Sequence, residues 1–319
     1  MKDALRQTRS YLMELFEQHG YRPRTDFGQN FLIDINLVEF IVESGEVTEQ
    51  DVVLEVGSGT GGMTAFLARQ AGHVISVEID RNIFPLAQYS VRDFDNVTLL
   101  NTDALKNKNR LSDEVLGAVE EQLAVDPQRR LKLIANLPYN VATPIISNLV
   151  ATELPWVRIV ATIQWELAQR MASRHGGGTN YGALSVWLQS QCEIEILKKM
   201  SPTVFWPRPK VDSAIVCLVP NEVKRSRIAD RPFLQDFLRR LFHHRRKMMR
   251  GVLAGMYRKQ LPKDRIDALL VELGISEQAR AEELPVERLV ELSNRFYRET
   301  DARDSPDRAR DNPASSLEL

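Results

Sequence analysis

The stretch that decides the fold is Val52-Val53-Leu54-Glu55-Val56-Gly57-Ser58-Gly59-Thr60-Gly61-Gly62. A short apolar run of this kind is typical of a buried strand, and the glycines after it suit a tight turn into a helix at about 63–70. Gly57, Gly59 and Gly62 satisfy the G-x-G-x-x-G spacing, which lets a backbone approach a bound nucleotide closely. These residues alone leave a dehydrogenase and a methyltransferase equally open.

Strands and helices continue to alternate along the chain, which predicts an α/β fold with a parallel sheet covered on both faces. Further strands are expected at 74–77, 97–100, 131–135 and 157–163, and helices at about 36–44, 82–90, from Thr143, 165–173 and 181–190. The last two strands, near 192–198 and 211–219, are predicted to form an antiparallel hairpin at one edge of the sheet.

Polar residues follow the predicted strands at the edge where ligands of open α/β sheets bind. Glu78 comes about 20 residues after Gly57, the spacing that suits a ribose diol. Asp103 ends the next strand and is placed to accept a hydrogen bond from an adenine amine. Together with the segment after the fourth strand, these acids favour a methyltransferase over a dehydrogenase.

That segment, Ile134-Ala135-Asn136-Leu137-Pro138-Tyr139, suits a flat base that carries an exocyclic amine. The Asn136 side chain offers an acceptor. Pro138 fixes φ and has no N–H, so the turn presents the carbonyl oxygens of Leu137 and Pro138 outward. The Tyr139 ring offers a face on which a base can stack.

Composition sets broad limits on the function. The chain has 319 residues with a formal net charge of −1, which neither favours nor excludes nucleic acid as a partner. Cys192 and Cys217 lie in apolar runs and are expected to be buried thiols. The five histidines form no ligand-spaced cluster with them, so we expect no metal site. Without a membrane-length apolar run or a signal-peptide core, the expected location is the cytoplasm.

The chain divides into four predicted parts. Residues 1–24 form an N-terminal helix and a basic linker, and residues 25–220 form the α/β domain. Residues 221–300 form a small all-helical domain, with helices at about 231–256, 263–273 and 285–298. The tail 301–319 is rich in Asp, Arg, Pro and Ser and is predicted to be disordered.

A basic stretch without acids runs from Arg239 to Arg250. As one amphipathic helix it would place apolar side chains on the core side and project Arg245, Arg246 and Lys247 toward phosphates. Other basic residues that could extend such a track are Arg208, Lys210, Arg22 and Arg24.

From about Gly28 to Asn294 the sequence resembles the class I S-adenosylmethionine-dependent methyltransferases. It is most similar to the small-subunit rRNA adenine N6,N6-dimethyltransferase family (KsgA family). The motifs that carry the resemblance are Gly28-Gln29-Asn30-Phe31-Leu32, Glu55-Val56-Gly57-Ser58-Gly59-Thr60-Gly61, Asn136-Leu137-Pro138-Tyr139, Phe205-Trp206-Pro207-Arg208-Pro209-Lys210-Val211-Asp212-Ser213 and Arg245-Arg246-Lys247.

The resemblance implies a Rossmann-like, mostly parallel seven-stranded sheet with an antiparallel edge hairpin, a helical rRNA-binding domain and S-adenosylmethionine as cofactor. It implies a monomer that dimethylates two adjacent adenosines near the 3′ end of small-subunit rRNA. Asn30 and Leu32 would close over the cofactor, and the turn of Gly57 and Gly59 would contact its methionine end. The remaining implied roles are ribose binding by Glu78, adenine binding by Asp103, cofactor and target-amine binding by Asn136, and base stacking by Tyr139 and Phe205.

Three features depart from the family pattern. Trp165 stands where such proteins usually carry Lys, residues 178–183 lack the usual basic residues, and the 106–130 stretch is longer. The first two bear on phosphate contacts and not on methyl transfer. Two other functions stay open: a large-subunit rRNA methyltransferase of the macrolide-resistance type, and a non-catalytic assembly factor. The helical module favours the small-subunit enzyme over the first, and the intact site residues argue against the second.

Overall fold

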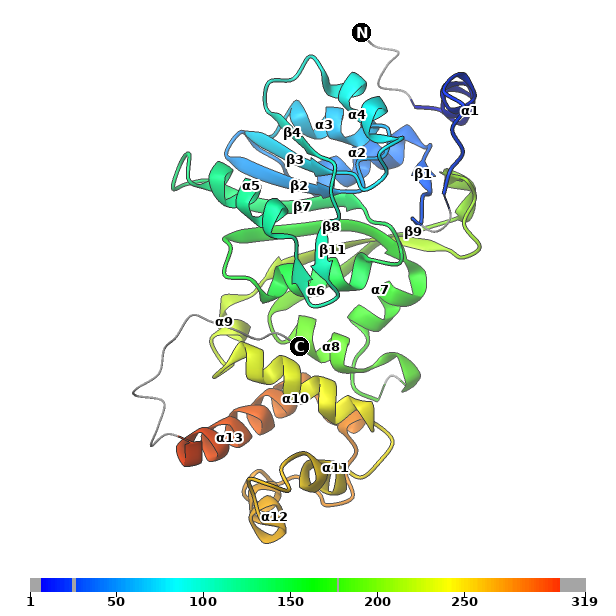
Figure 1. The fold of residues 1–319 in the computed structure, drawn as a ribbon. Coiled ribbons are helices and arrows are strands. Elements are labelled where there is room, and N and C mark those ends of the chain that lie inside the picture. Colours follow the sequence, from blue (N-terminus) through cyan, green and yellow to red (C-terminus); the bar gives the residue numbers. More distant parts are fainter. Residues whose placement is uncertain (1–6, 25–26, 177, 305–319) are drawn as a thin grey trace. The chain divides into compact units, whose positions relative to one another are not determined.

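The computed structural model describes residues 7–24, 27–176 and 178–304 (Figure 1). Contacts divide the chain into two compact units. The unit we call the sheet unit runs through Ala172 and resumes over Cys192–Asn221, and the helical unit takes Ser173–Gln191 and the chain from Glu222 onward. The helical unit thus includes a segment that the sequence assigned to the α/β domain. The predicted disordered tail lies outside the described residues from 305 onward, as do residues 1–6 of the predicted N-terminal helix.

A seven-stranded sheet forms the centre of the sheet unit, with strand order β4-β3-β2-β7-β8-β11-β9. All neighbours are parallel except β11, which is antiparallel to both β8 and β9, so the predicted edge hairpin is confirmed. The strands are β2 (Asp51–Val56), β3 (His73–Val77), β4 (Val97–Leu100), β7 (Arg130–Asn136), β8 (Trp156–Gln164), β9 (Cys192–Met200) and β11 (Ser213–Pro220).

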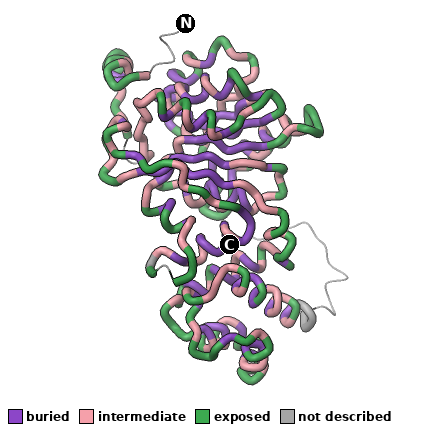
Figure 2. Tube along the Cα trace, turned by 180° about the vertical axis from the view of Figure 1, so that it is seen from behind, coloured by how far each residue is buried: buried purple, intermediate pink, exposed green. Residues whose placement is uncertain are grey.

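The central strands are buried on both faces, as the continuous purple strands in Figure 2 show. Every residue of β2 is buried, which fits a strand that helices cover on both sides. On one face Leu37, Ile41 and Leu67 join a cluster of buried residues with Val53 and Ile134. The helices of the sheet unit are α1 (Arg9–Gln18), α2 (Ile35–Ser44), α3 (Gly62–Ala68), α4 (Phe84–Val91), α5 (Asp113–Leu123), α6 (Ala142–Ala151) and α7 (Trp165–Ala172).

Two short sheets were not predicted from the sequence. β1 (Phe31–Leu32) pairs antiparallel with β10 (Phe205–Trp206) in a segment that looked too irregular for either period. The longer 106–130 region holds the antiparallel pair β5 (Leu105–Asn107) and β6 (Arg110–Leu111), followed by α5. Strands of two or three residues are too short for a hydrophobic period to be read from them.

The helical unit differs from the prediction at one important place. The single helix expected over 231–256 is two helices, because α10 ends at His243 and α11 begins at Met249, with a turn of basic residues between them. The expected 221–230 linker also contains a short helix, and the last helix continues to Asp304. Its helices are α8 (Ala183–Gln189), α9 (Glu222–Arg225), α10 (Arg231–His243), α11 (Met249–Met256), α12 (Lys263–Glu272) and α13 (Val286–Asp304).

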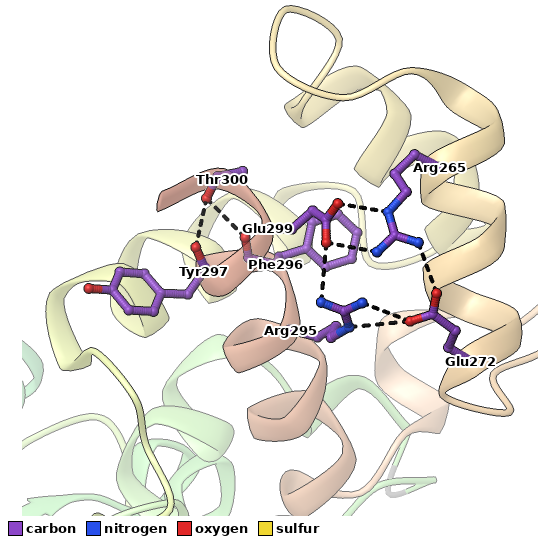
Figure 3. A network of polar contacts seen from close by, with 7 residues as sticks. All are labelled: Arg265, Glu272, Arg295, Phe296, Tyr297, Glu299 and Thr300. Atoms are coloured by element: carbon purple, nitrogen blue, oxygen red, sulfur yellow. Dashed lines mark hydrogen bonds and ion pairs between the residues drawn. The ribbon is translucent and has the colours of Figure 1, made fainter. Parts of the chain in front are cut away.

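Ion pairs join α12 to α13 (Figure 3). Arg265 donates to both carboxylate oxygens of Glu299, at 2.7 and 2.8 Å, and to Glu272 at 2.8 Å. Arg295 bonds the same two carboxylates, at 2.8 Å to Glu272 and 3.1 Å to Glu299. Each carboxylate therefore faces two guanidinium groups, and networked pairs of this kind count for more than isolated ones.

Candidate active site

The turn after β2 needs glycine at its tight positions. Gly57 and Gly59 adopt φ of +86° and +54°, in the left-handed region that favours glycine. A Cβ at Gly57 would lie 3.2 Å from the Pro138 ring, and one at Gly59 would lie 2.9 Å from the Phe31 ring. The glycines thus let the turn lie against two other motif segments at once.

Glu78 follows β3 and lies beside this turn. Its side chain is only 5% exposed and accepts hydrogen bonds from the backbone N–H of Gly59 at 2.8 Å and of Asp80 at 2.9 Å. Burial raises the pKa of Glu78 to about 7, although these backbone bonds act in the opposite direction. A carboxylate has about four acceptor sites, so two remain for hydroxyl donors such as those of a ribose.

A second buried carboxyl, Glu55, lies within β2 and was not predicted as a functional residue. It is 1% exposed and accepts from the hydroxyls of Thr64 at 2.5 Å and Ser76 at 2.6 Å. Burial raises its pKa to about 7 as well. Glu55 ties α3 and β3 to β2 beneath the glycine turn, and no periodic signal in the sequence distinguishes it from an ordinary strand residue.

Asp103 follows β4 and is exposed, with its carboxylate accepting from the backbone N–H of Leu105 at 2.9 Å. This bond fixes the carboxylate at the mouth of a cavity along the carboxyl ends of the strands. The cavity has about 920 Å³ of empty space including its open mouth. Its lining brings together most of the predicted site residues: Asn30, Gly57, Gly59, Glu78, Asp103, Asn136, Leu137, Pro138 and Tyr139.

Asn136 ends β7 and holds the cavity wall together. Its side-chain N–H donates to the backbone carbonyl of Asn30 at 2.9 Å. Because that carbonyl can only accept, the amide nitrogen must face it, and the amide oxygen is left as the acceptor group of this side chain. The orientation that an amine-binding role needs is therefore set by the segment around Asn30.

The turn after Asn136 refines one prediction. The Pro138 carbonyl already accepts from the Val141 N–H at 3.1 Å, so the Leu137 carbonyl is the better candidate acceptor. The Tyr139 hydroxyl bonds the Ser213 hydroxyl at 2.5 Å, which fixes the ring on the cavity wall. Burial raises the pKa of Tyr139, so this hydroxyl stays protonated.

The segment Gly28–Leu32 forms a cover beside this wall. Gln29 donates to Asp80 at 2.9 Å, and the Asn30 side chain donates to the Gly28 carbonyl at 3.1 Å. Leu32 lines a second cavity, which shares Phe31, Gly57, Gly59 and Asn136 with the first. Sequence periodicity missed this cover, and only the family resemblance indicated it.

Phe205 occupies a different position from the one expected for a stacking residue. Its side chain is 3% exposed and packs in the buried cluster with Met200 and Ile215. Neither of the two cavities described above includes it in its lining. Phe205 pairs with Leu32 through the β1–β10 ladder, so in this structure it supports the cover from behind.

The predicted basic residues fall in both units. Arg208 and Lys210 are exposed in the loop before β11 and line neither cavity. In the helical unit Arg246 and Lys247 are exposed in the turn between α10 and α11, whereas Arg245 is partly buried and lies 3.9 Å from Glu282. A groove at this turn is lined by Arg239, Arg240, His243, His244, Arg246, Lys247, Met248, Gly251, Val252, Gly255, Met256 and Arg280.

Two further searches cover only the part of the chain that the structure describes. No group of three or more His, Cys, Asp or Glu there could hold a metal ion. None of the described helices combines the length and apolarity needed to cross a membrane.

The strand order, the glycine turn and the acid after β3 define a class I, Rossmann-like methyltransferase that uses S-adenosylmethionine. The residues present fit this cofactor, because Gly57 and Gly59 leave space for it that a side chain would fill and Glu78 keeps free acceptor sites. Residues 20–298 match the family "Ribosomal RNA adenine dimethylase", so the chain belongs to that family.

Relatives and solved structures agree with this assignment. "Ribosomal RNA small subunit methyltransferase A" from Pediococcus pentosaceus is 38% identical over 283 residues, covering 88% of this chain and 92% of the relative. The protein of that name from Lachnoclostridium phytofermentans is 35% identical over 284 residues, with coverage of 88% and 94%.

Two solved structures share the fold. A dimethyladenosine transferase from Plasmodium falciparum aligns with a TM-score of 0.67 at 23% identity, over 83% of this chain and 97% of the other. The 23S rRNA methyltransferase ErmE aligns with a TM-score of 0.58 at 23% identity, over 83% and 99%.

Proposed function

We propose that this chain transfers methyl groups from S-adenosylmethionine to N6 of two adjacent adenosines near the 3′ end of small-subunit rRNA, giving N6,N6-dimethyladenosines. It would act as a monomer in the cytoplasm on a precursor of the small ribosomal subunit. The observation that carries the proposal is the Asn136 amide, oriented by the Asn30 carbonyl at 2.9 Å on the wall of the cofactor cavity. The names of the relatives at 35–38% identity support the choice of rRNA.

The chain's own residues supply positioning. S-adenosylmethionine, when bound, supplies an electrophilic methyl group on its sulfonium. The N6 lone pair of adenine is delocalised into the ring, which makes it a poor nucleophile. Acceptors at the Asn136 side chain and the Leu137 carbonyl would bond the amine hydrogens and favour a tetrahedral nitrogen with a free lone pair. Positioning of this kind can supply roughly 7–11 kcal/mol in favourable cases.

Asn136 suits this role because no strong base is needed. The methylated ammonium is acidic and loses its proton to water, so an amide serves where a carboxylate would be unnecessary. The target base must leave its stack at a cost of a few kcal/mol. Stacking on Tyr139, at about 1–3 kcal/mol, would offset that cost. Because Phe205 is buried, the proposal assigns the stacking to Tyr139 alone.

The helical unit would bind rRNA phosphates through the groove at the α10–α11 turn, where Arg246 and Lys247 are exposed. A large-subunit methyltransferase is the second candidate, because ErmE shares the fold. At 23% identity this likeness concerns the fold alone, whereas the small-subunit relatives match 88% of the chain at higher identity.

A labelled-methyl assay on undermethylated small and large ribosomal subunits tests the proposal. We expect incorporation into adenosines of the small-subunit rRNA and none into the large. Asn136→Ala should lower the transfer rate by about 10²–10³-fold, as removal of a positioned polar group does in other enzymes, while RNA binding without cofactor survives. Incorporation into large-subunit RNA only would support the second candidate. No transfer by the wild-type chain to either subunit would support the assembly-factor alternative.

A further inference from the structure

The segment Gln7–Gln18, which we call the N-terminal strap, has no role in the function proposed above. It lies outside residues 20–298, the part of the chain that matches the family. Yet it contacts the glycine turn directly. The Gln7 side-chain N–H donates to the Thr60 carbonyl at 3.2 Å, and the Thr60 hydroxyl donates to the Gln7 side-chain oxygen. Both ends of one amide are thus bonded to one residue of the turn.

Thr60 is the point where the turn can be held. Its neighbours Gly59 and Gly61 both have positive φ, and glycine gives a chain more conformational freedom than any other residue. The Thr60 carbonyl also accepts from the Ser90 hydroxyl at 2.7 Å. Gln7 therefore adds a second side-chain bond to a backbone segment that would otherwise be mobile.

The helix of the strap is anchored on the cover of the cavity. Phe16 is 2% exposed and packs edge-on against Phe31 and Trp206, with ring centroids 5.3 and 5.1 Å apart. It also belongs to a small buried cluster with Ile83 and Leu86. Aromatic pairs of this geometry add about 0.5–1.5 kcal/mol each beyond burial of their area. The anchor thus joins the strap to both strands of the β1–β10 ladder.

The strap also forms part of a cavity wall. Gln7 and Thr8 line the second cavity, together with Leu32, the glycine turn and Asn136. This cavity adjoins the first one at Phe31, Gly57, Gly59 and Asn136. By family resemblance Gly57 and Asn136 contact the methionine end of the cofactor, so Gln7 and Thr8 lie on the side where that end would be enclosed.

We propose that the N-terminal strap closes the cofactor site at its methionine end, and that Gln7 is a positioning residue that holds the glycine turn in its binding geometry. Gln7 acts through Thr60 and not by contact with the reacting atoms. The strap thereby slows the release of S-adenosylmethionine and of the demethylated product. This inference rests on cofactor use by the family and not on the choice of rRNA target.

The test measures cofactor binding by the full chain without RNA. Gln7→Ala should raise the dissociation constant for S-adenosylmethionine about three- to tenfold, mainly through faster dissociation. Phe16→Leu, which loosens the anchor but keeps an apolar side chain, should shift the constant in the same direction. In transfer assays the KM for S-adenosylmethionine should rise in Gln7→Ala, while the KM for RNA stays unchanged.

Gln18→Ala is the matched control, because Gln18 lies on the same strap and its side chain donates to exposed Glu14, away from the glycine turn. A Gln7→Ala dissociation constant within twofold of this control would overturn the proposal. So would a parallel loss of thermal stability and RNA affinity, since Gln7 would then be a general stabilising contact. If the wild-type chain binds S-adenosylmethionine but methylates no small-subunit RNA, the proposed target fails while the strap is still tested.

Discussion

In the sheet unit, Glu55 and Glu78 are buried beside hydroxyl and backbone N–H donors, and burial raises the pKa of each to about 7. In the helical unit, Glu272 lies between Arg265 and Arg295 (Figure 3), and its bond to Arg295 holds its pKa below the ordinary value. The cofactor site thus keeps acids that cost stability, whereas the helical unit pairs its acids with cations. Stability is lower where a ligand must be bound and higher where the chain only has to hold its shape.

Gly57→Ala should produce the largest effect on the sheet unit. The new Cβ would occupy a left-handed backbone position 3.2 Å from Pro138, and it would displace the turn that carries Asn136. We expect the free energy of unfolding to fall by about 1–3 kcal/mol and methyl transfer to fall by more than about 100-fold. Chemical denaturation and the labelled-methyl assay measure these two quantities.

Gly117→Ala is the control for this change, since Gly117 lies in α5 with nothing within 4 Å of an added Cβ. It should leave transfer unchanged and raise stability by about 0.5–1 kcal/mol. Equal transfer rates for the two variants would mean that the close approach of the glycine turn to Pro138 is not needed for activity.

Glu55→Gln should produce the next largest effect, seen as a change in how stability depends on pH. The folded pKa of about 7 is above the ordinary value of 4.5. Between these values the unfolded chain has lost the Glu55 proton while the folded chain retains it, so the free energy of unfolding falls as pH rises. The loss reaches about 3 kcal/mol once the pH is above 7. Denaturation of wild type and variant from pH 4 to 8 measures it.

Glu78 contributes a similar slope, so Glu55→Gln should remove part of the wild-type pH dependence and not all of it. Glu120→Gln, at an exposed position on α5, should keep the full wild-type profile. An unchanged profile in Glu55→Gln would show that this carboxyl is ionised in the folded protein throughout the range.

Arg246→Ala combined with Lys247→Ala should give the smallest effect, on RNA affinity alone. Both side chains are exposed at the groove, and removing one bound phosphate partner should reduce the salt slope of binding by about 0.9. Filter binding to small-subunit rRNA at several salt concentrations measures the slope. Arg258→Ala with Lys259→Ala removes the same charge outside this groove and should keep the slope. Identical slopes in the two double variants would remove the groove from the RNA-binding account.

Much of this architecture could be predicted from the sequence. The apolar runs that became β2, β3 and β7 are continuous because those strands are buried on both faces, and such runs are easily recognised. The residues after them, Glu78 and Asn136, were found because parallel strands bring their carboxyl ends to one edge.

Features that depend on distant contacts could not be predicted in this way. The break between α10 and α11 was missed because the basic stretch keeps a helical period across it, while Met249 donates instead to the Ala279 carbonyl at 2.9 Å. The burial of Phe205 was missed because its packing partners Met200 and Ile215 come from two different strands. Local sequence does not contain this information.

The two-residue ladder between β1 and β10 also bears on how the protein is made. Leu32 is among the first residues to leave the ribosome, but its partner Phe205 is synthesised only after six of the seven strands of the main sheet. Contacts between such distant positions form slowly. A nascent chain would therefore assemble most of its sheet before it can cover the cofactor, so synthesis would pass the β10 codons before the enzyme first becomes competent.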